Sequence, residues 1–94
     1  MAAINKLSHS QVKAAKKTGL LNDGGGLYLQ ISKAGTKSWI LRFKLHGKRR
    51  DMGLGGYRDI SLAEAREMAA ESRKLAKKNI DPIEQRKASQ KALA

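Results

Sequence analysis

Two segments of the chain alternate apolar and polar residues with a period of two, and this alternation constrains the fold more than any other feature. In residues 27–32 the apolar positions are Leu27, Leu29 and Ile31. In residues 37–45 they are Trp39, Leu41, Phe43 and Leu45. Successive side chains of a strand point to opposite faces of a sheet, so each segment is predicted to be a strand with one buried face. Trp39 and Phe43 are accordingly interpreted as core residues.

The connection between these two strands sets their register. A three-residue loop over 34–36 would place Ile31 opposite Trp39 and keep every apolar side chain on one side of the sheet. A four-residue loop would place Ile31 opposite Ser38 and divide the apolar residues between the two faces. We therefore expect the three-residue loop.

A third strand is predicted over about 48–53, after a two-residue turn at His46 and Gly47 with positive φ. The strand would end at the glycines of 53–56. A bulge in it would exchange the faces of Arg49 and Arg50, and the sequence leaves both arrangements open. Without a bulge, the turn pairs Leu41 with Met52, Arg42 with Asp51, and Lys44 with Arg49.

Helix signals lie on both sides of the strands. Ser8 with Gln11, and Ser61 with Glu64, have the spacing of capping boxes. They predict a short helix over 8–17 that stops near Gly19, and a long helix over 61–78 that stops at Asn79. The long helix carries an apolar stripe that would cover the sheet, made of Leu62, Ala65, Met68, Ala69, Ser72, Leu75 and Ala76.

Together these elements predict an α+β fold, a three-stranded antiparallel sheet packed against a C-terminal α-helix, with a short N-terminal helix. The sequence of residues 81–84, Asp-Pro-Ile-Glu, is a further helix start. The residues after it are polar and rich in alanine. The domain is therefore predicted over 1–80, and 81–94 is interpreted as a helical tail or linker.

The charge balance indicates a polyanionic partner, because 20 Lys and Arg stand against 8 Asp and Glu, a formal net charge of +12. On the predicted polar face of the sheet, Asp51 is the only acid. Arg, Lys and Gln are the side chains that hydrogen-bond purine edges, and Ser and Tyr reach phosphates or bases. The candidate DNA-binding residues are Tyr28, Gln30, Ser32, Ser38, Arg42, Lys44, Lys48, Arg49 and Arg50.

Several other classes of protein are disfavoured. The chain has no cysteine and only two histidines, His9 and His46, so we predict no metal, no cofactor and no small-molecule substrate. No Ser/His/Asp set converges, and no catalytic residue is predicted. The glycines at 24–26 precede a strand rather than a helix, which indicates a tight turn and not a phosphate loop. Without an apolar run or a leader pattern, no membrane contact is expected and the expected compartment is the cytoplasm.

Several motifs follow one another in a fixed order across residues 5–83. They are Leu7-Ser8, Asp23-Gly24-Gly25-Gly26-Leu27-Tyr28-Leu29, Lys37-Ser38-Trp39-Ile40-Leu41-Arg42-Phe43, Gly47-Lys48-Arg49-Arg50, Leu54-Gly55, Ser61-Leu62-Ala63-Glu64-Ala65-Arg66 and Ile80-Asp81-Pro82. Their order and spacing resemble those of the N-terminal arm-type DNA-binding domain of phage and genomic-island tyrosine recombinases (P4-like integrases). One departure is Arg58, where that family usually has proline after Tyr57.

The resemblance implies that the sheet enters the major groove of double-stranded DNA at arm-type sites during integration and excision of mobile DNA. It also implies core-binding and catalytic domains C-terminal to Ala94, contact with other integrase protomers, and a place at the bacterial nucleoid. A stand-alone RNA-binding or ribosome-associated domain would share the charge and size. Such platforms usually stack bases on several aromatic residues, and Tyr28 is the only aromatic on the predicted polar face. A protein-interaction module would not need the net charge.

Overall fold

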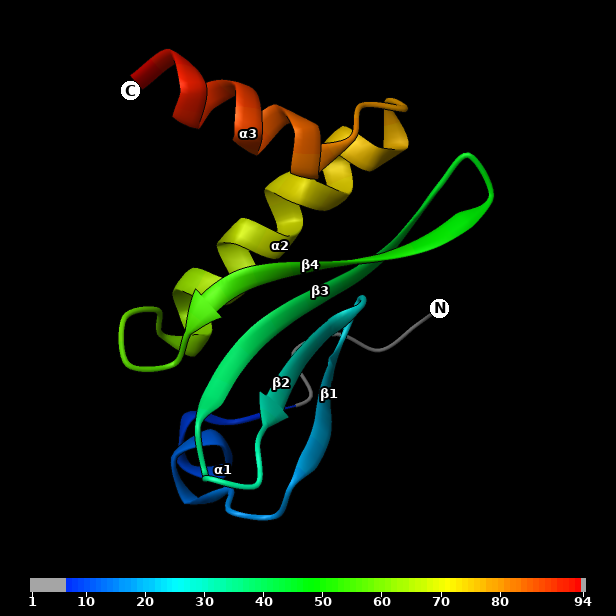
Figure 1. Ribbon diagram of the computed structural model, residues 1–94. Helices are drawn as coiled ribbons and strands as arrows, with labels where there is room; N and C mark the ends of the chain where they lie inside the picture. Colours follow the sequence, from blue (N-terminus) through cyan, green and yellow to red (C-terminus); the bar gives the residue numbers. More distant parts are fainter. Residues whose placement is uncertain (1–6, 94) are drawn as a thin grey trace.

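The computed structural model describes residues 7–93, and their side chains as far as Ala88. A four-stranded antiparallel sheet in the order β1-β2-β3-β4 is covered on one face by helices (Figure 1). The elements are α1 (His9–Ala14), β1 (Gly19–Gly24), β2 (Leu27–Ile31), β3 (Lys37–Leu45), β4 (Lys48–Gly56), α2 (Leu62–Lys77) and α3 (Pro82–Leu93). The α+β class is as predicted.

The strand β1 corrects the prediction of three strands and of a helix reaching residue 17. Helix α1 ends at Ala14, and Gly19, expected as a helix stop, is instead the first residue of β1. This strand pairs with β2 along its whole length. It shows no alternation, because Leu20 and Leu21 are adjacent and Asn, Asp and Gly follow, residues that are depleted in strands. Pairing with β2 therefore determines its conformation.

The loop between β2 and β3 is longer than predicted. Ile31 lies opposite Lys37, and Leu29 lies opposite Trp39, so five residues, 32–36, form the connection. The hydroxyl of Ser32 accepts a hydrogen bond from the backbone N–H of Thr36, which closes the turn. The predicted register would have placed Lys33 directly opposite Lys37, a repulsive pair of like charges. The shift is an even number of residues, so the apolar side chains keep their face.

The β3–β4 hairpin has the predicted register near its tip. His46 and Gly47 form the turn with φ of 53° and 77°. Arg42 lies opposite Asp51, and Lys44 lies opposite Arg49. The bulge in β4 falls further along the strand, where Gly53 pairs with Ile40 and Gly55 pairs with Trp39, leaving Leu54 as the extra residue. Because the bulge comes after Asp51, it leaves Arg49 on the polar face.

The starts of α1 and α2 and the end of α2 follow their sequence signals. Both capping boxes are formed, at Ser8 with Gln11 and at Ser61 with Glu64. At the C-terminus of α2, Asn79 has a φ of 62°. The N–H of Ile80 donates to the carbonyl of Leu75, and that of Asn79 donates to Ala76, which is the Schellman pattern. A carboxylate oxygen of Asp81 accepts from the N–H of Ile83 and caps α3.

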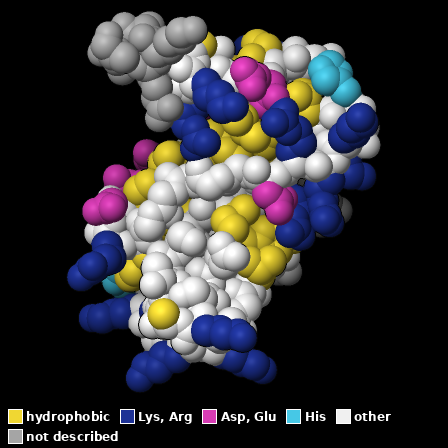
Figure 2. Space-filling view, in the orientation of Figure 1, with side chains coloured by type: hydrophobic (Ala, Val, Ile, Leu, Met, Phe, Trp, Pro, Cys, Tyr) yellow, Lys and Arg dark blue, Asp and Glu magenta, His cyan; other side chains and the backbone are white. Residues whose placement is uncertain are grey.

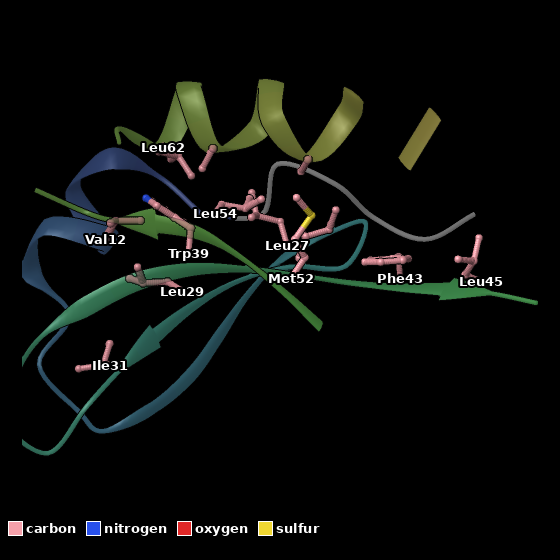
Figure 3. Close-up of a cluster of buried hydrophobic side chains, with 13 residues drawn as sticks. Val12, Leu27, Leu29, Ile31, Trp39, Phe43, Leu45, Met52, Leu54 and Leu62 are labelled. Atoms are coloured by element: carbon pink, nitrogen blue, oxygen red, sulfur yellow. The ribbon is translucent and has the colours of Figure 1, made fainter. Parts of the chain in front are cut away.

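The core lies between the sheet and the helices α1 and α2 (Figure 3). Trp39 and Phe43 are buried there, as predicted, and the indole N–H of Trp39 donates to the carbonyl of Ile60 at 2.8 Å. The stripe of α2 is narrower than predicted, because its Met68 is 36% exposed. The helix approaches the sheet through the small side chains of Ala65 and Ala69, both of them fully buried, and Met68 lies to the side of that contact.

One ion pair ties the N-terminal segment to the rest of the fold. Asp23 is 1% exposed and lies beside α2, where Arg66 donates to both of its carboxylate oxygens at 2.9 Å. Asp23 also accepts from the N–H of Leu7, while Arg66 donates to the carbonyl of Leu7. The hydrogen bonds from Arg66 to Asp23 raise the pKa of the guanidinium. The carboxylate before the glycines is therefore structural, and the glycines form a turn.

Candidate nucleic-acid interface

The face of the sheet away from the helices is the candidate interface, and we call it the polar face. Burial alternates along β3 and places Ser38, Ile40, Arg42 and Lys44 on this side. The strand registers add residues from the other three strands, and the full set is Leu20, Asn22, Tyr28, Gln30, Ser38, Ile40, Arg42, Lys44, Arg49 and Asp51.

Arg42 occupies the middle of the polar face and is held by two neighbours. Its Nε donates to Oδ1 of Asp51 at 3.0 Å, and its Nη2 donates to Oδ2 at 3.4 Å. Its Cζ lies 5.0 Å from the centre of the Tyr28 ring, in a cation–π contact. The hydrogen bonds from Arg42 hold the pKa of the Asp51 carboxyl below its ordinary value, and they raise the pKa of Arg42. The pair is therefore ionised near neutral pH.

Lys44 and Arg49 lie on the polar face near the tip of the hairpin, opposite each other and exposed. Within residues 7–88 neither side chain forms an ion pair. The face of the molecule in Figure 2 carries Lys and Arg around the tip of the β3–β4 hairpin and again at the end that holds α1, with mainly uncharged side chains between. The outer half of the hairpin thus presents cations that are free to bind an anion.

Three of the predicted site residues lie off the polar face. Ser32 follows β2 and uses its hydroxyl within the turn to β3. Lys48 lies opposite Leu45 and so shares the side of the buried residues, at the tip of the hairpin. Arg50 lies opposite Phe43 on the same side and forms an ion pair with Asp81 at the start of α3. Gln30 and Ser38 pair with each other on the polar face as part of the predicted set.

The polar face also contains residues that were not predicted as site residues. Leu20 and Asn22 come from β1, so missing that strand also missed them. Ile40 also lies on this face, between Tyr28 and Gly53, and is half-buried. Leu20 is 46% exposed. Apolar side chains in such positions contact the methyl groups of thymine in protein–DNA complexes.

Several basic residues away from the polar face are engaged by the protein itself. The ammonium of Lys37 donates to two carbonyls in the last turn of α1, those of Val12 and Lys13, at 2.9 and 2.8 Å. Arg73 donates to the carbonyl of Gly25 in the β1–β2 turn, and Arg86 donates to the carbonyl of Gly53. By contrast, the lysines on and after α1, and those at the end of α2, are exposed: Lys13, Lys16, Lys17, Lys74, Lys77 and Lys78.

The described part of the chain contains no group of three or more potential metal ligands. None of the helices in residues 7–93 is long and apolar enough to cross a membrane.

Comparison with known proteins agrees with this arrangement. The model of the family described as the arm DNA-binding domain matches residues 7–89. The integrase of Shigella phage Sf6 is 42% identical over 86 residues, which are 88% of this chain and 22% of that protein. The prophage integrase IntS of Escherichia coli K12 has the same identity and coverage. The integrase of Enterobacteria phage P4 is 37% identical over 82 residues, which are 82% of this chain and 19% of that protein.

The chain therefore belongs to the arm DNA-binding domain family, which confirms the family predicted from the sequence motifs. It spans about a fifth of the length of these curated relatives, all of which are named integrases.

Proposed function

We propose that this chain is the N-terminal domain of a site-specific integrase and binds double-stranded DNA by inserting its sheet into the major groove at arm-type sites. The observation that carries the proposal is the polar face. This sheet surface carries Arg42, Lys44 and Arg49, and among the described residues on it Asp51 is the single acid. Integration and excision would be catalysed by domains outside this chain, with other protomers in the assembly, at the nucleoid of a bacterial cell.

The shape of the sheet supports this mode of binding. The major groove of B-DNA is about 12 Å wide and admits a two-stranded β-ribbon. The β3–β4 hairpin projects beyond the helices at its tip (Figure 1), so its outer half is accessible from the polar side. In this pose Arg42, Gln30 and Tyr28 would approach the bases, and Lys44 and Arg49 the flanking phosphates. Ser38, Ser32 and Lys48 would lie at the margins, and Arg50 would brace β4 from behind.

Fluorescence anisotropy with labelled random-sequence duplex DNA, single-stranded DNA and duplex RNA, each at two salt concentrations, tests the proposal. We expect the duplex DNA to bind most tightly. The double variant Lys44→Ala/Arg49→Ala should weaken binding at least tenfold and make the salt slope about two units shallower. The matched control Lys77→Ala/Lys78→Ala removes the same charge from the end of α2 and should have a much smaller effect.

Two results would overturn the proposal. A larger loss in the control than in the hairpin variant would place the interface on α2. Tighter binding to RNA than to duplex DNA would favour the alternative of an RNA-binding or ribosome-associated domain.

A further inference from the structure

Asp51 occupies one of the two hydrogen-bonding edges of the Arg42 guanidinium. A guanidinium has five N–H donors in a rigid planar fork. Asp51 engages the edge formed by Nε and Nη2. Within residues 7–88, the hydrogen bonds of the guanidinium that satisfy the distance and angle criteria go to Asp51, and none uses the edge formed by Nη1 and the remaining N–H of Nη2. The nearby Tyr28 side chain makes a smaller contribution to the raised pKa of Arg42. The Cζ of Arg42 lies over the Tyr28 ring, 5.0 Å from its centre.

We propose that Arg42 and Asp51 act as one unit that recognises guanine, in which Asp51 is a positioning residue that determines specificity. The inference rests on the proposed function and adds the base that is recognised. Two parallel N–H groups on the free edge match the two acceptors that guanine presents in the major groove, O6 and N7. Side-chain exposures of 28% for Arg42 and 47% for Asp51 leave the unit open to a base edge.

The negative charge of Asp51 repels the DNA phosphates, but the geometry of its pair with Arg42 favours specific binding. A free arginine has a long flexible side chain, and it binds a phosphate as readily as a base. Asp51 neutralises Arg42 toward the phosphate backbone, which carries no sequence information. It also fixes the plane of the guanidinium before DNA arrives, and this reduces the ordering cost of binding a guanine. The pair should therefore lower affinity for random DNA and raise discrimination.

The experiment uses a pool of duplexes of about 20 base pairs with randomised centres, enriched by binding to each purified variant and then sequenced. The wild type should enrich a motif with at least one guanine that the Asp51→Asn variant no longer selects. The affinity ratio of selected to unselected duplex should fall about 5- to 150-fold in Asp51→Asn, the range of one bidentate base contact. Asp51→Asn should also bind the unselected pool more tightly, with a salt slope about one unit steeper.

Two further variants separate this role from a general charge or folding effect. Glu67→Gln removes one negative charge from an exposed position on α2, across the sheet, and should leave the affinity ratio unchanged. Arg42→Lys keeps the positive charge but lacks the two parallel N–H groups of the guanidinium, and should no longer select the guanine that the wild type selects. The double variant Asp51→Asn/Arg42→Lys should lose no more discrimination than either single variant. Circular dichroism melts establish that each variant is folded.

Replacement of the selected guanine by 7-deazaguanine removes only the N7 acceptor and leaves base pairing intact. It should weaken the wild type at least fivefold and Asp51→Asn by less than twofold. Asp51→Asn could instead select the same guanine, with the same affinity ratio of selected to unselected duplex and the same loss of affinity for 7-deazaguanine as the wild type. In that case the inference is wrong while the proposed function stands. If the wild type enriches no motif at all, the proposed function fails and the inference fails with it.

Discussion

Gly26 lies in the β1–β2 turn, beside Arg42 of β3. Its carbonyl accepts a hydrogen bond from the backbone N–H of Arg42 at 2.7 Å, and its φ is +86°. A Cβ at this position would lie 2.1 Å from the carbonyl oxygen of Arg42. That atom belongs to the backbone of a central strand, so a rotamer change cannot relieve the clash. We expect Gly26→Ala to be strongly destabilising.

The magnitude follows from two contributions. A non-glycine residue at positive φ costs about 1–2 kcal/mol. Displacing the turn also leaves the backbone N–H of Arg42 without its acceptor, the carbonyl of Gly26. The loss of such a hydrogen bond costs about 1–3 kcal/mol when the group is buried. The sum, about 2–5 kcal/mol, is a large part of the about 5–14 kcal/mol expected for a domain of this length. At about 4–8 °C per kcal/mol, the melting temperature should fall by about 10–40 °C.

Gly35 provides a matched control, because its φ is +88° and a Cβ there meets nothing within 4 Å. Gly35→Ala carries the same conformational strain and the same effect on the unfolded chain, but no clash. Thermal unfolding followed by circular dichroism should show a fall of about 5–15 °C for Gly35→Ala and a clearly larger fall for Gly26→Ala. Equal shifts in the two variants would refute the idea that close approach to β3, rather than positive φ, requires glycine at position 26.

Three further predictions concern the helix face, the buried carboxylate and the Arg42–Asp51 pair. Ala69→Asp should destabilise the domain by about 3 kcal/mol or more in urea unfolding, because it buries a charge, whereas the more exposed Met68→Asp should stay within about 1 kcal/mol. Asp23→Ala should cost about 2–3 kcal/mol, less than a fully buried pair, because the guanidinium of its partner is 30% exposed; an unchanged unfolding midpoint would contradict this. An NMR titration should place the pKa of Asp51 below that of an ordinary aspartate, and Arg42→Gln should raise this pKa. The stability that the pair contributes is therefore fully present at pH values above the ordinary aspartate pKa and is lost as the pH falls through the lowered pKa.

The elements predicted correctly are those whose own residues determine their conformation. The alternation of β3, the positive φ at His46 and Gly47, and the capping boxes of the helices are local signals, and each appears in the structure where it was expected. Strand β1 lacks such a signal, because its conformation depends on pairing with β2. The β2–β3 register depended on loop length, and the hydrogen bonds of Ser32 that extend the loop leave little trace in the sequence.

The same distinction applies to the interface. The turn register placed Arg42 opposite Asp51, which follows from counting residues. The bulge lies at Leu54, between Gly53 and Gly55, and not before Arg49. Glycine inside a strand often marks a bulge, but the sequence left the position of this one open. The contacts of individual residues with DNA remain predictions, and so does the division of the chain at residue 80.

Net charge alone would overestimate the number of cations available to DNA. The formal charge of +12 counts every lysine and arginine alike. In the fold, neighbouring residues of β4 have different roles, since Arg49 faces the polar side while Arg50 is paired with Asp81. Other cations bind protein groups as well, namely Lys37, Arg66, Arg73 and Arg86.

The salt dependence of binding should therefore reflect the polar face and the exposed lysines near it rather than the whole chain. If about five to seven phosphates are neutralised, the slope of log K against log salt should be about −4 to −6, well short of the value that the net charge would suggest. Anisotropy titrations across a range of salt concentrations measure this slope directly. A slope near zero would contradict phosphate binding by the domain, and a slope near −11 would mean that the paired cations are released when DNA binds.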